Sequence, residues 1–190
     1  MNIKKNGQFF YLKQASQWVR GTIFQGERLK IAFKMAEASF SSNIMSPGYP
    51  WSGLSQGWHS LQAYEEELFV VAIQRAIFYI ELLGKDILEY KGIANTIDHS
   101  VKLEYIKDIR NMRTHANEYI SGKGRDKDRY MFEAPPSYAA DATSTIIING
   151  QYLIGGRLDA FAALDIFKSL LPNIERLEIQ KWMELSKEDI

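Results

Sequence analysis

Residues 105–115 read YIKDIRNMRTH, and the order of apolar and polar residues in this stretch decides the fold class that we predict. Its apolar members recur three or four positions apart, which is the spacing of one buried face of an α-helix. We expect the helix to begin after Asp98 or Ser100, either of which can cap it, and to end near Gly122. The complete predicted face comprises Tyr105, Ile106, Ile109, Met112, Ala116, Tyr119 and Ile120.

The same spacing predicts two helices before this one. The first runs from about Glu27 to Phe40, and the second runs from about Ser60, its expected N-cap, to Leu88. Gly84 is the weak point of the second helix, where we expect it to kink or to end. The predicted buried face of the first helix comprises Leu29, Ala32, Phe33, Ala36 and Phe40. That of the second comprises Tyr64, Leu68, Val71, Ala72, Tyr79, Leu82 and Leu83.

Residues 144–154 predict a β-hairpin instead. Asn149-Gly150 supplies the two positive φ angles of a type I′ turn, and β-branched and aromatic residues flank it on both sides. A final helical stretch begins near Leu158, and Pro172 is expected to kink it or divide it in two. The expected fold is therefore mainly α: one domain over residues 1–190, an antiparallel helical bundle with a β-hairpin insertion.

The composition is typical of a folded, soluble domain. Hydrophobic residues make up 46% of the chain, and 23 Lys and Arg balance 23 Asp and Glu. The zero net charge argues against nonspecific coating of nucleic acid, which needs many cationic contacts to phosphate, but it leaves room for a local basic site. The chain has no cysteine, which excludes disulfides and thiol nucleophiles. With no signal-peptide pattern and no apolar run near the ~20 residues of a membrane span, a cytoplasmic protein is expected.

Two further segments carry chemistry that the pattern leaves open. Residues 41–59 lack helical periodicity and contain Tyr49, Trp51 and Trp58. These aromatic residues can cover the end of the bundle, which we favour, stack on a nucleic-acid base, or close as a lid over a small ligand. The acidic run Glu65-Glu66-Glu67 is expected to form a solvated face of the second helix.

The polar residues of the stretch at 105–115 gather on the side of the helix opposite its apolar face. With Ile109 at zero and 100° per residue, Arg110 lies at about 100° and Thr114 at about 140°. Asn111 lies at about 200° and His115 at about 240°. All four therefore point away from the core, and they combine a fixed cation with an imidazole, a group that titrates near neutrality. A plain solvated surface would have the same pattern.

Arg113 is placed differently from these neighbours. It lies at about 40°, at the edge of the apolar face, where its stem should pack beside Ile106 and Ala116. Its guanidinium then needs a carboxylate, because a buried unpaired cation is costly. Glu81 on the second helix is the partner that we expect.

The common nucleotide and metal motifs are missing from the sequence. It contains no GxxxxGK[ST] phosphate loop, no dinucleotide fingerprint and no GxSxG nucleophile elbow. His59, His99 and His115 lie far apart along the chain, and there is no HExxH pair. We therefore predict neither a metal site nor a cofactor, and the candidate chemistry centres on residues 110–115.

Arg110-Asn111-Met112-Arg113-Thr114-His115 resembles the motif of the HEPN superfamily, an Arg, a polar residue and a His with four to six positions between Arg and His. The resemblance covers roughly residue 27 to the C-terminus and implies a helical bundle, in agreement with the periodicity. One toxin branch has a Tyr two positions after the His. Here Asn117 occupies that position, and Tyr119 follows the His by four.

The resemblance implies a metal-independent endoribonuclease that acts as a homodimer, with Arg110, Asn111 and His115 as its catalytic residues. His115 would activate the ribose 2′-OH, Arg110 would stabilise the phosphate, and Asn111 would orient the His or bind the phosphate. Thr114, Lys123 and Arg125 are the expected substrate contacts, although the loop that holds the last two is equally consistent with a solvated helix exit. Such enzymes serve as toxins or defence and stress effectors, for which an inhibitory protein partner is expected.

Two other functions remain open on the sequence. The first is a HEPN-like interaction module without catalysis, which docks a protein through the polar face. The absence of an extended basic stripe favours this module, whereas the complete Arg-polar-His set favours the enzyme. The second is a small-ligand receptor, for which the Trp-rich segment 41–59 is the evidence.

Overall fold

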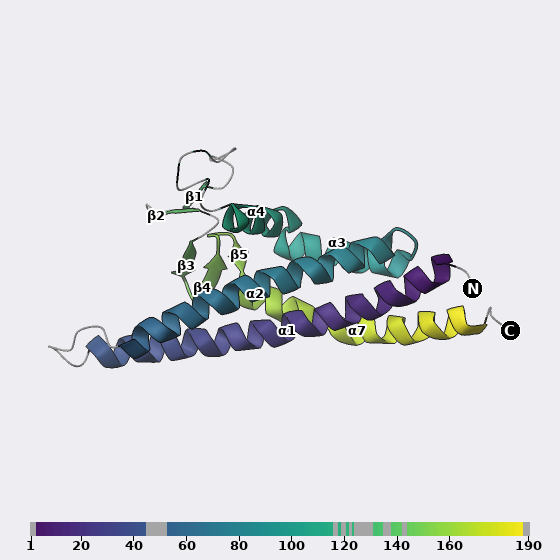
Figure 1. Cartoon of the computed structure of the whole chain (residues 1–190), viewed down its shortest axis with the longest axis horizontal. Helices are drawn as coiled ribbons and strands as arrows, with labels where there is room; N and C mark the ends of the chain where they lie inside the picture. The colour runs from purple at the N-terminus through teal and green to yellow at the C-terminus, as the bar shows by residue number, and fades with distance from the viewer. Residues whose placement is uncertain are drawn as a thin grey trace.

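The structure is a computed structural model. It describes residues 3–44, 53–115, 131–134, 138–141 and 144–187, and the single positions 118, 121 and 123. Helices α1 (Ile3–Ile44) and α2 (Gly53–Gly84) run antiparallel along the whole length of an elongated molecule (Figure 1). Helix α7 (Ala160–Lys187) lies beside the N-terminal half of α1, so both ends of the chain lie at the same end of the molecule (Figure 1).

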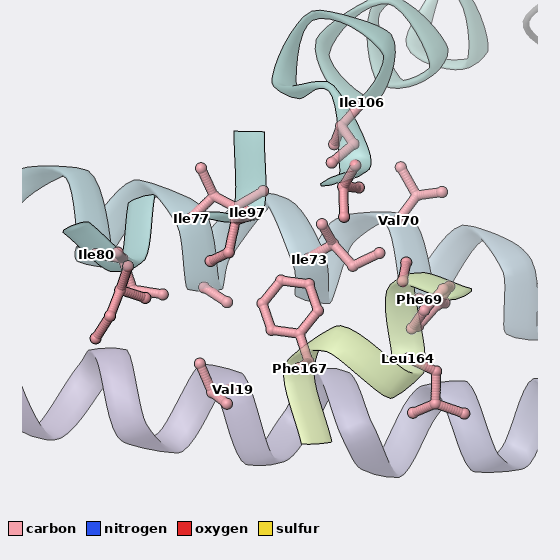
Figure 2. Close-up of a cluster of buried hydrophobic side chains, with 14 of the residues drawn as sticks. Val19, Phe69, Val70, Ile73, Ile77, Ile80, Ile97, Ile106, Leu164 and Phe167 are labelled. Carbon is pink, nitrogen blue, oxygen red and sulfur yellow. The ribbon is translucent and has the colours of Figure 1, made fainter. Parts of the chain in front are cut away.

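Two shorter helices, α3 (Leu88–Val101) and α4 (Leu103–Thr114), pack on the other side of α2. One continuous core joins the five helices that the structure describes. Phe167 of α7 lies between the ribbons of α1 and α2, next to Ile73 and Ile77, and Ile106 of α4 points toward α2 from above (Figure 2). The mainly α fold class that the sequence predicts is confirmed for the described residues.

Two glycines allow the helices to come this close. A Cβ on Gly26 of α1 would lie 2.8 Å from Leu164 Cδ1 and 2.9 Å from Phe69 Cε2, so α1, α2 and α7 converge at a position that only glycine fits. A Cβ on Gly84 would lie 3.1 Å from the backbone of Lys91. Gly84 ends α2, as expected, and lets the chain turn directly into α3.

Five short strands lie between α4 and α7. Strands β1 (Met131–Ala134) and β2 (Tyr138–Asp141) form an antiparallel pair. Strands β3 (Thr145–Ile148), β4 (Gln151–Ile154) and β5 (Leu158–Asp159) form an antiparallel sheet in that order. The β3–β4 hairpin is confirmed, with φ of 51° at Asn149 and 77° at Gly150. The sequence prediction did not include the other three strands.

The C-terminal helix differs from its prediction in one respect. Pro172 lies inside α7, which continues through it as one helix, so the chain is not divided there. The helix begins after Asp159, whose Oδ1 accepts hydrogen bonds from the backbone N–H groups of Phe161 and Ala162, both at 3.1 Å.

The first two helices are longer than predicted. Helix α1 starts at Ile3 rather than near residue 27, because Leu12, Ala15 and Val19 continue its buried face toward the N-terminus. Helix α2 starts at Gly53, so Ser60 lies within the helix and is not its N-cap. Residues 41–44 and 53–59 are therefore helical rather than loop, and residues 45–52, with Tyr49 and Trp51, lie outside the described residues.

The predicted buried face of α1 is largely confirmed, whereas that of α2 is largely wrong. On α1, Leu29, Ala32 and Ala36 are buried as expected. On α2 the face is rotated from the prediction, because Tyr64 is 59% exposed and only Ala72 and Leu83 of the expected set are fully buried. The observed buried apolar residues of α2 are Phe69, Val70, Ala72, Ile73, Ala76, Ile77, Ile80 and Leu83.

The region around residue 100 forms two helices where the sequence suggested one. Helix α3 was missed, although its buried residues Tyr90, Ile93, Ile97 and Val101 have helical spacing. Helix α4 ends at Thr114 instead of near Gly122. Part of the predicted face, Ala116, Tyr119 and Ile120, lies outside the described residues.

Candidate functional site

Helix α4 begins at a sharp corner of the backbone. Lys102 separates α3 from α4 with φ of 57°, a left-handed conformation that is uncommon outside glycine. Asp98 stabilises the corner, because its Oδ1 accepts a hydrogen bond of 3.0 Å from the Leu103 N–H and its carbonyl accepts one of 3.0 Å from the Lys102 N–H. Neither predicted N-cap is correct: the N-cap of α4 is Lys102, and Asp98 and Ser100 both lie within α3, where the Ser100 hydroxyl donates to the Thr96 carbonyl.

The outward face of α4 carries the polar residues that the sequence indicated. Arg110, Asn111, Thr114 and His115 are all exposed, while Ile106, Ile109 and Met112 on the opposite side are buried. The face is thus an open, hydrated patch that contains one arginine and one histidine.

The sequence predicted a position inside the helix for His115. In the structure His115 is instead the C-cap of α4, with φ −109° and ψ 23°. Its backbone N–H still donates to the Asn111 carbonyl at 3.0 Å. Its φ differs from the helical value of about −63°, so the imidazole does not point in the direction that an uninterrupted helix would give. The angle of about 140° between Arg110 and His115 on an ideal wheel therefore no longer applies.

Glu118 is a neighbour of His115 that the sequence analysis missed. Its Oε1 lies 3.2 Å from Nδ1 of His115, and both side chains are exposed. A carboxylate at this distance from Nδ1 accepts a hydrogen bond in the tautomer that has its proton on Nδ1, and in that tautomer Nε2 is the basic nitrogen. The signal was present in the sequence as His and Glu three residues apart.

The expected substrate contacts are only partly described. Thr114 and Lys123 are exposed, and the Lys123 N–H donates to the Glu118 carbonyl at 2.8 Å, which brings the lysine backbone close to the His115–Glu118 pair. Arg125 lies outside the described residues.

Arg113 lies on the inner edge of α4, as the helical wheel predicted. Its side chain is 11% exposed and its Nη2 lies 3.0 Å from Glu66 Oε2, while Nη1 lies 3.4 Å from Glu67 Oε2. The expectation of a carboxylate partner is confirmed, but the expected partner Glu81 is wrong. Residues 66 and 67 face α4, whereas Glu81 lies four turns further along α2.

Glu66 is the centre of a buried polar cluster. Its residue is 4% exposed, and its carboxylate accepts hydrogen bonds from Arg113 at 3.0 Å, Thr145 Oγ1 at 2.7 Å and the Tyr152 hydroxyl. Gln62 donates in turn to the Tyr152 oxygen. Burial and the nearby Glu66 charge raise the pKa of Tyr152 well above its ordinary value, so the phenol remains a donor.

Glu65 forms a second pair on the neighbouring side of α2. It is 1% exposed, and both of its oxygens lie 3.0 Å from Arg28 Nε of α1. The predicted solvated face at 65–67 is therefore wrong for its first two members. Both lie on the same side of the helix as Phe69 and Ile73, so the periodicity of the buried residues would have placed them correctly.

Two further features bear on the candidate site. Within the ranges that the structure describes, no three His, Asp or Glu side chains come close enough to share a metal ion. No described helix combines the length and apolar character that crossing a membrane requires.

Comparisons with known proteins give no match. No family model, no curated protein and no solved structure is similar to this chain.

Proposed function

We propose that this protein is a metal-independent endoribonuclease whose site is built on the outer face of α4, with Arg110, Asn111 and His115 as its catalytic residues. The observation that supports this function best is the exposure of all three side chains together with the carboxylate of Glu118 at His115 Nδ1. The pair resembles the acid–base unit of enzymes in which a carboxylate orients a histidine base.

The chemistry follows from the groups on this face. His115 Nε2 takes the proton of a ribose 2′-OH, and the 2′-oxygen attacks the adjacent phosphorus. Arg110 stabilises the negative charge that grows on the phosphate oxygens through paired N–H donors. The P–O5′ bond breaks, a 2′,3′-cyclic phosphate remains on one product, and the 5′-oxygen must receive a proton.

A homodimer provides the second proton donor. The face of α4 is exposed and contains one histidine, so two copies related by a two-fold axis would place the partner's His115 opposite the first. The protonated imidazole of the partner subunit's His115 then donates to the leaving 5′-oxygen. Asn111 and Thr114 lie beside these groups and contact the phosphate, and Lys123 extends the cationic surface from the other side of Glu118.

We further propose that the protein is cytoplasmic and acts as a toxin or defence effector. A protein partner that covers the exposed face of α4 would inhibit it. The RNA substrate needs access to the same face, so the two ligands would compete.

Incubation of the purified protein with total RNA tests the function directly. We expect cleavage that survives EDTA and leaves 2′,3′-cyclic phosphate ends. Light scattering at micromolar protein should report twice the chain mass of 21.8 kDa. A requirement for a divalent metal contradicts the mechanism. A complete lack of cleavage favours the interaction module, and a monomer removes the composite site.

A further inference from the structure

Two polar contacts flank the apolar face of α4, one on each edge. On the first edge, Arg113, at about 40° from Ile109, pairs with Glu66 of α2. On the second edge, Asp108, at about −100°, lies 3.8 Å from Arg157, and the Arg157 guanidinium lies 5.4 Å from the ring centroid of Tyr105. Ile109 and Met112 lie between these two positions on the wheel, and Ile106, at about 60°, lies just beyond Arg113.

Both contacts lead to the same small sheet. Glu66 is held by Thr145 of β3 and by Tyr152 of β4, in addition to Arg113. Arg157 belongs to the turn between β4 and β5, at the open end of the hairpin, where Thr145 pairs with Ile154. The sheet lies beside α2, under α4 (Figure 1). It reaches one edge of α4 directly through Arg157 and the other edge through Glu66 of α2.

Apolar contacts alone do not fix the rotation of a helix about its own axis. Burial of hydrophobic surface is non-directional, and only three apolar side chains of α4, those of Ile106, Ile109 and Met112, are fully buried. Ion pairs and hydrogen bonds depend on direction and distance. The two polar edges therefore determine which residues of α4 face outward.

We infer that the β3–β4–β5 sheet clamps α4 at a defined rotation through Glu66–Arg113 on one edge and Arg157–Asp108 on the other, and that these four are positioning residues for Arg110, Asn111 and His115. The clamp itself rests on contacts in the structure, and its consequence for catalysis rests on the proposed function. None of the four residues touches substrate, because each is buried or nearly so.

The chain contains a matched control for this inference. Glu65 and Glu66 are adjacent on α2, both are buried and each binds an arginine. Glu65 binds Arg28 of α1, and among the described residues no hydrogen bond or ion pair joins Glu65 to α4 or the sheet. Glu65→Gln and Glu66→Gln therefore make the same chemical change at the same depth. Only the second removes a charge from the clamp.

Amide hydrogen exchange of residues 103–114 tests the clamp without RNA. We expect Glu66→Gln to accelerate exchange in this segment by at least about tenfold relative to Glu65→Gln, with α1 unaffected. Equal exchange in the two variants overturns the inference. Arg157→Lys, which weakens the other edge, provides a second measurement if Glu66→Gln does not fold.

Kinetics with RNA test the positioning role. We expect Glu66→Gln to lower kcat by about 10- to 100-fold with KM nearly unchanged, because substrate still binds but the reacting groups are misplaced. Arg113→Lys in the otherwise unchanged chain should lower kcat less than Glu66→Gln does, since a lysine keeps a positive charge opposite Glu66. If the wild-type protein cleaves and both glutamine variants have the same kcat, the positioning role is excluded. If the wild type does not cleave, the proposed function fails, while hydrogen exchange still decides the clamp.

Discussion

Arg110 and Arg113 lie one turn apart on α4 in opposite surroundings. Arg110 is exposed, whereas the Arg113 side chain is 11% exposed and binds Glu66 and Glu67. The two side chains point only about 60° apart around the helix axis, yet one is exposed and the other connects α4 to α2. Residue type alone therefore says little about role, and the position relative to the buried face decides it.

The same contrast applies to the acidic residues of α2. Glu66 accepts from three donors inside the protein, and the side chain of Glu67, the next residue, is 44% exposed. The outer face of α4 therefore offers groups for chemistry, and the inner cluster holds that face in place. The following predictions test this division, from the largest expected effect to the smallest.

Substitution on the outer face should remove activity and leave stability intact. We expect His115→Ala to lower cleavage by about 10²- to 10⁴-fold, because it removes the general base. Arg110→Ala should lower cleavage by about 10²- to 10³-fold, because it removes the charge opposite the phosphate. Parallel assays of RNA cleavage and thermal unfolding would check both. His99→Ala and Arg75→Ala, exposed residues on α3 and α2, are the controls and should retain full activity.

Removal of the buried carboxylate of Glu66 should lower stability strongly. Glu66→Ala leaves the Arg113 guanidinium without its buried partner, and we expect a loss of about 3–5 kcal/mol in the free energy of unfolding. Glu67→Ala, at an exposed position, should cost about 0.5 kcal/mol. Urea denaturation of both variants would measure the difference. Similar values for the two would show that Glu66 is not the centre of the cluster.

Two glycines, one buried between helices and one exposed, allow a comparison of stability that involves no charge. Gly26→Ala places a methyl group against Leu164 and Phe69, and we expect it to destabilise the fold by about 1–3 kcal/mol. Gly92→Ala on the exposed side of α3 meets no atom within 4 Å and should stabilise by up to about 1 kcal/mol through helix propensity. The two melting temperatures should therefore shift in opposite directions, and a shift in the same direction would contradict the packing at Gly26.

Alkaline pH should weaken the buried cluster gradually. Burial raises the pKa of Tyr152 and of Tyr90 above the ordinary value of 10.0, so each phenol keeps its proton in the folded chain after the unfolded chain has lost it. Stability from each tyrosine is complete below pH 10 and declines above it, by about 1.4 kcal/mol per pH unit. Unfolding in urea at pH 9 to 11 should show a shallower decline for Tyr152→Phe than for the wild type. Identical slopes would indicate that the phenol ionises in the folded state.

The helices and the hairpin were predictable where local pattern carries the information. Asn149-Gly150 determines its turn because few other residues adopt two positive φ angles, and the spacing of Ile106, Ile109 and Met112 defines the buried side of α4. The start of α1 and the whole of α3 were missed, although Leu12, Ala15 and Val19, and Ile93 and Ile97, follow helical spacing. In both regions polar and small residues interrupt the apolar pattern, and tertiary packing supplies the stability that the local sequence lacks.

For the candidate site, the sequence by itself determined which residues of α4 face outward, because the helical period places Arg110, Asn111 and Thr114 opposite Ile109. It also placed Arg113 at the edge of the core. Only the tertiary structure decided that Glu66 is its partner, that Thr145 and Tyr152 complete the cluster, and that Glu118 lies beside His115. A helical period fixes directions within one element, whereas partners from α2, β3 and β4 are chosen by how separate elements pack, and that depends on the whole chain.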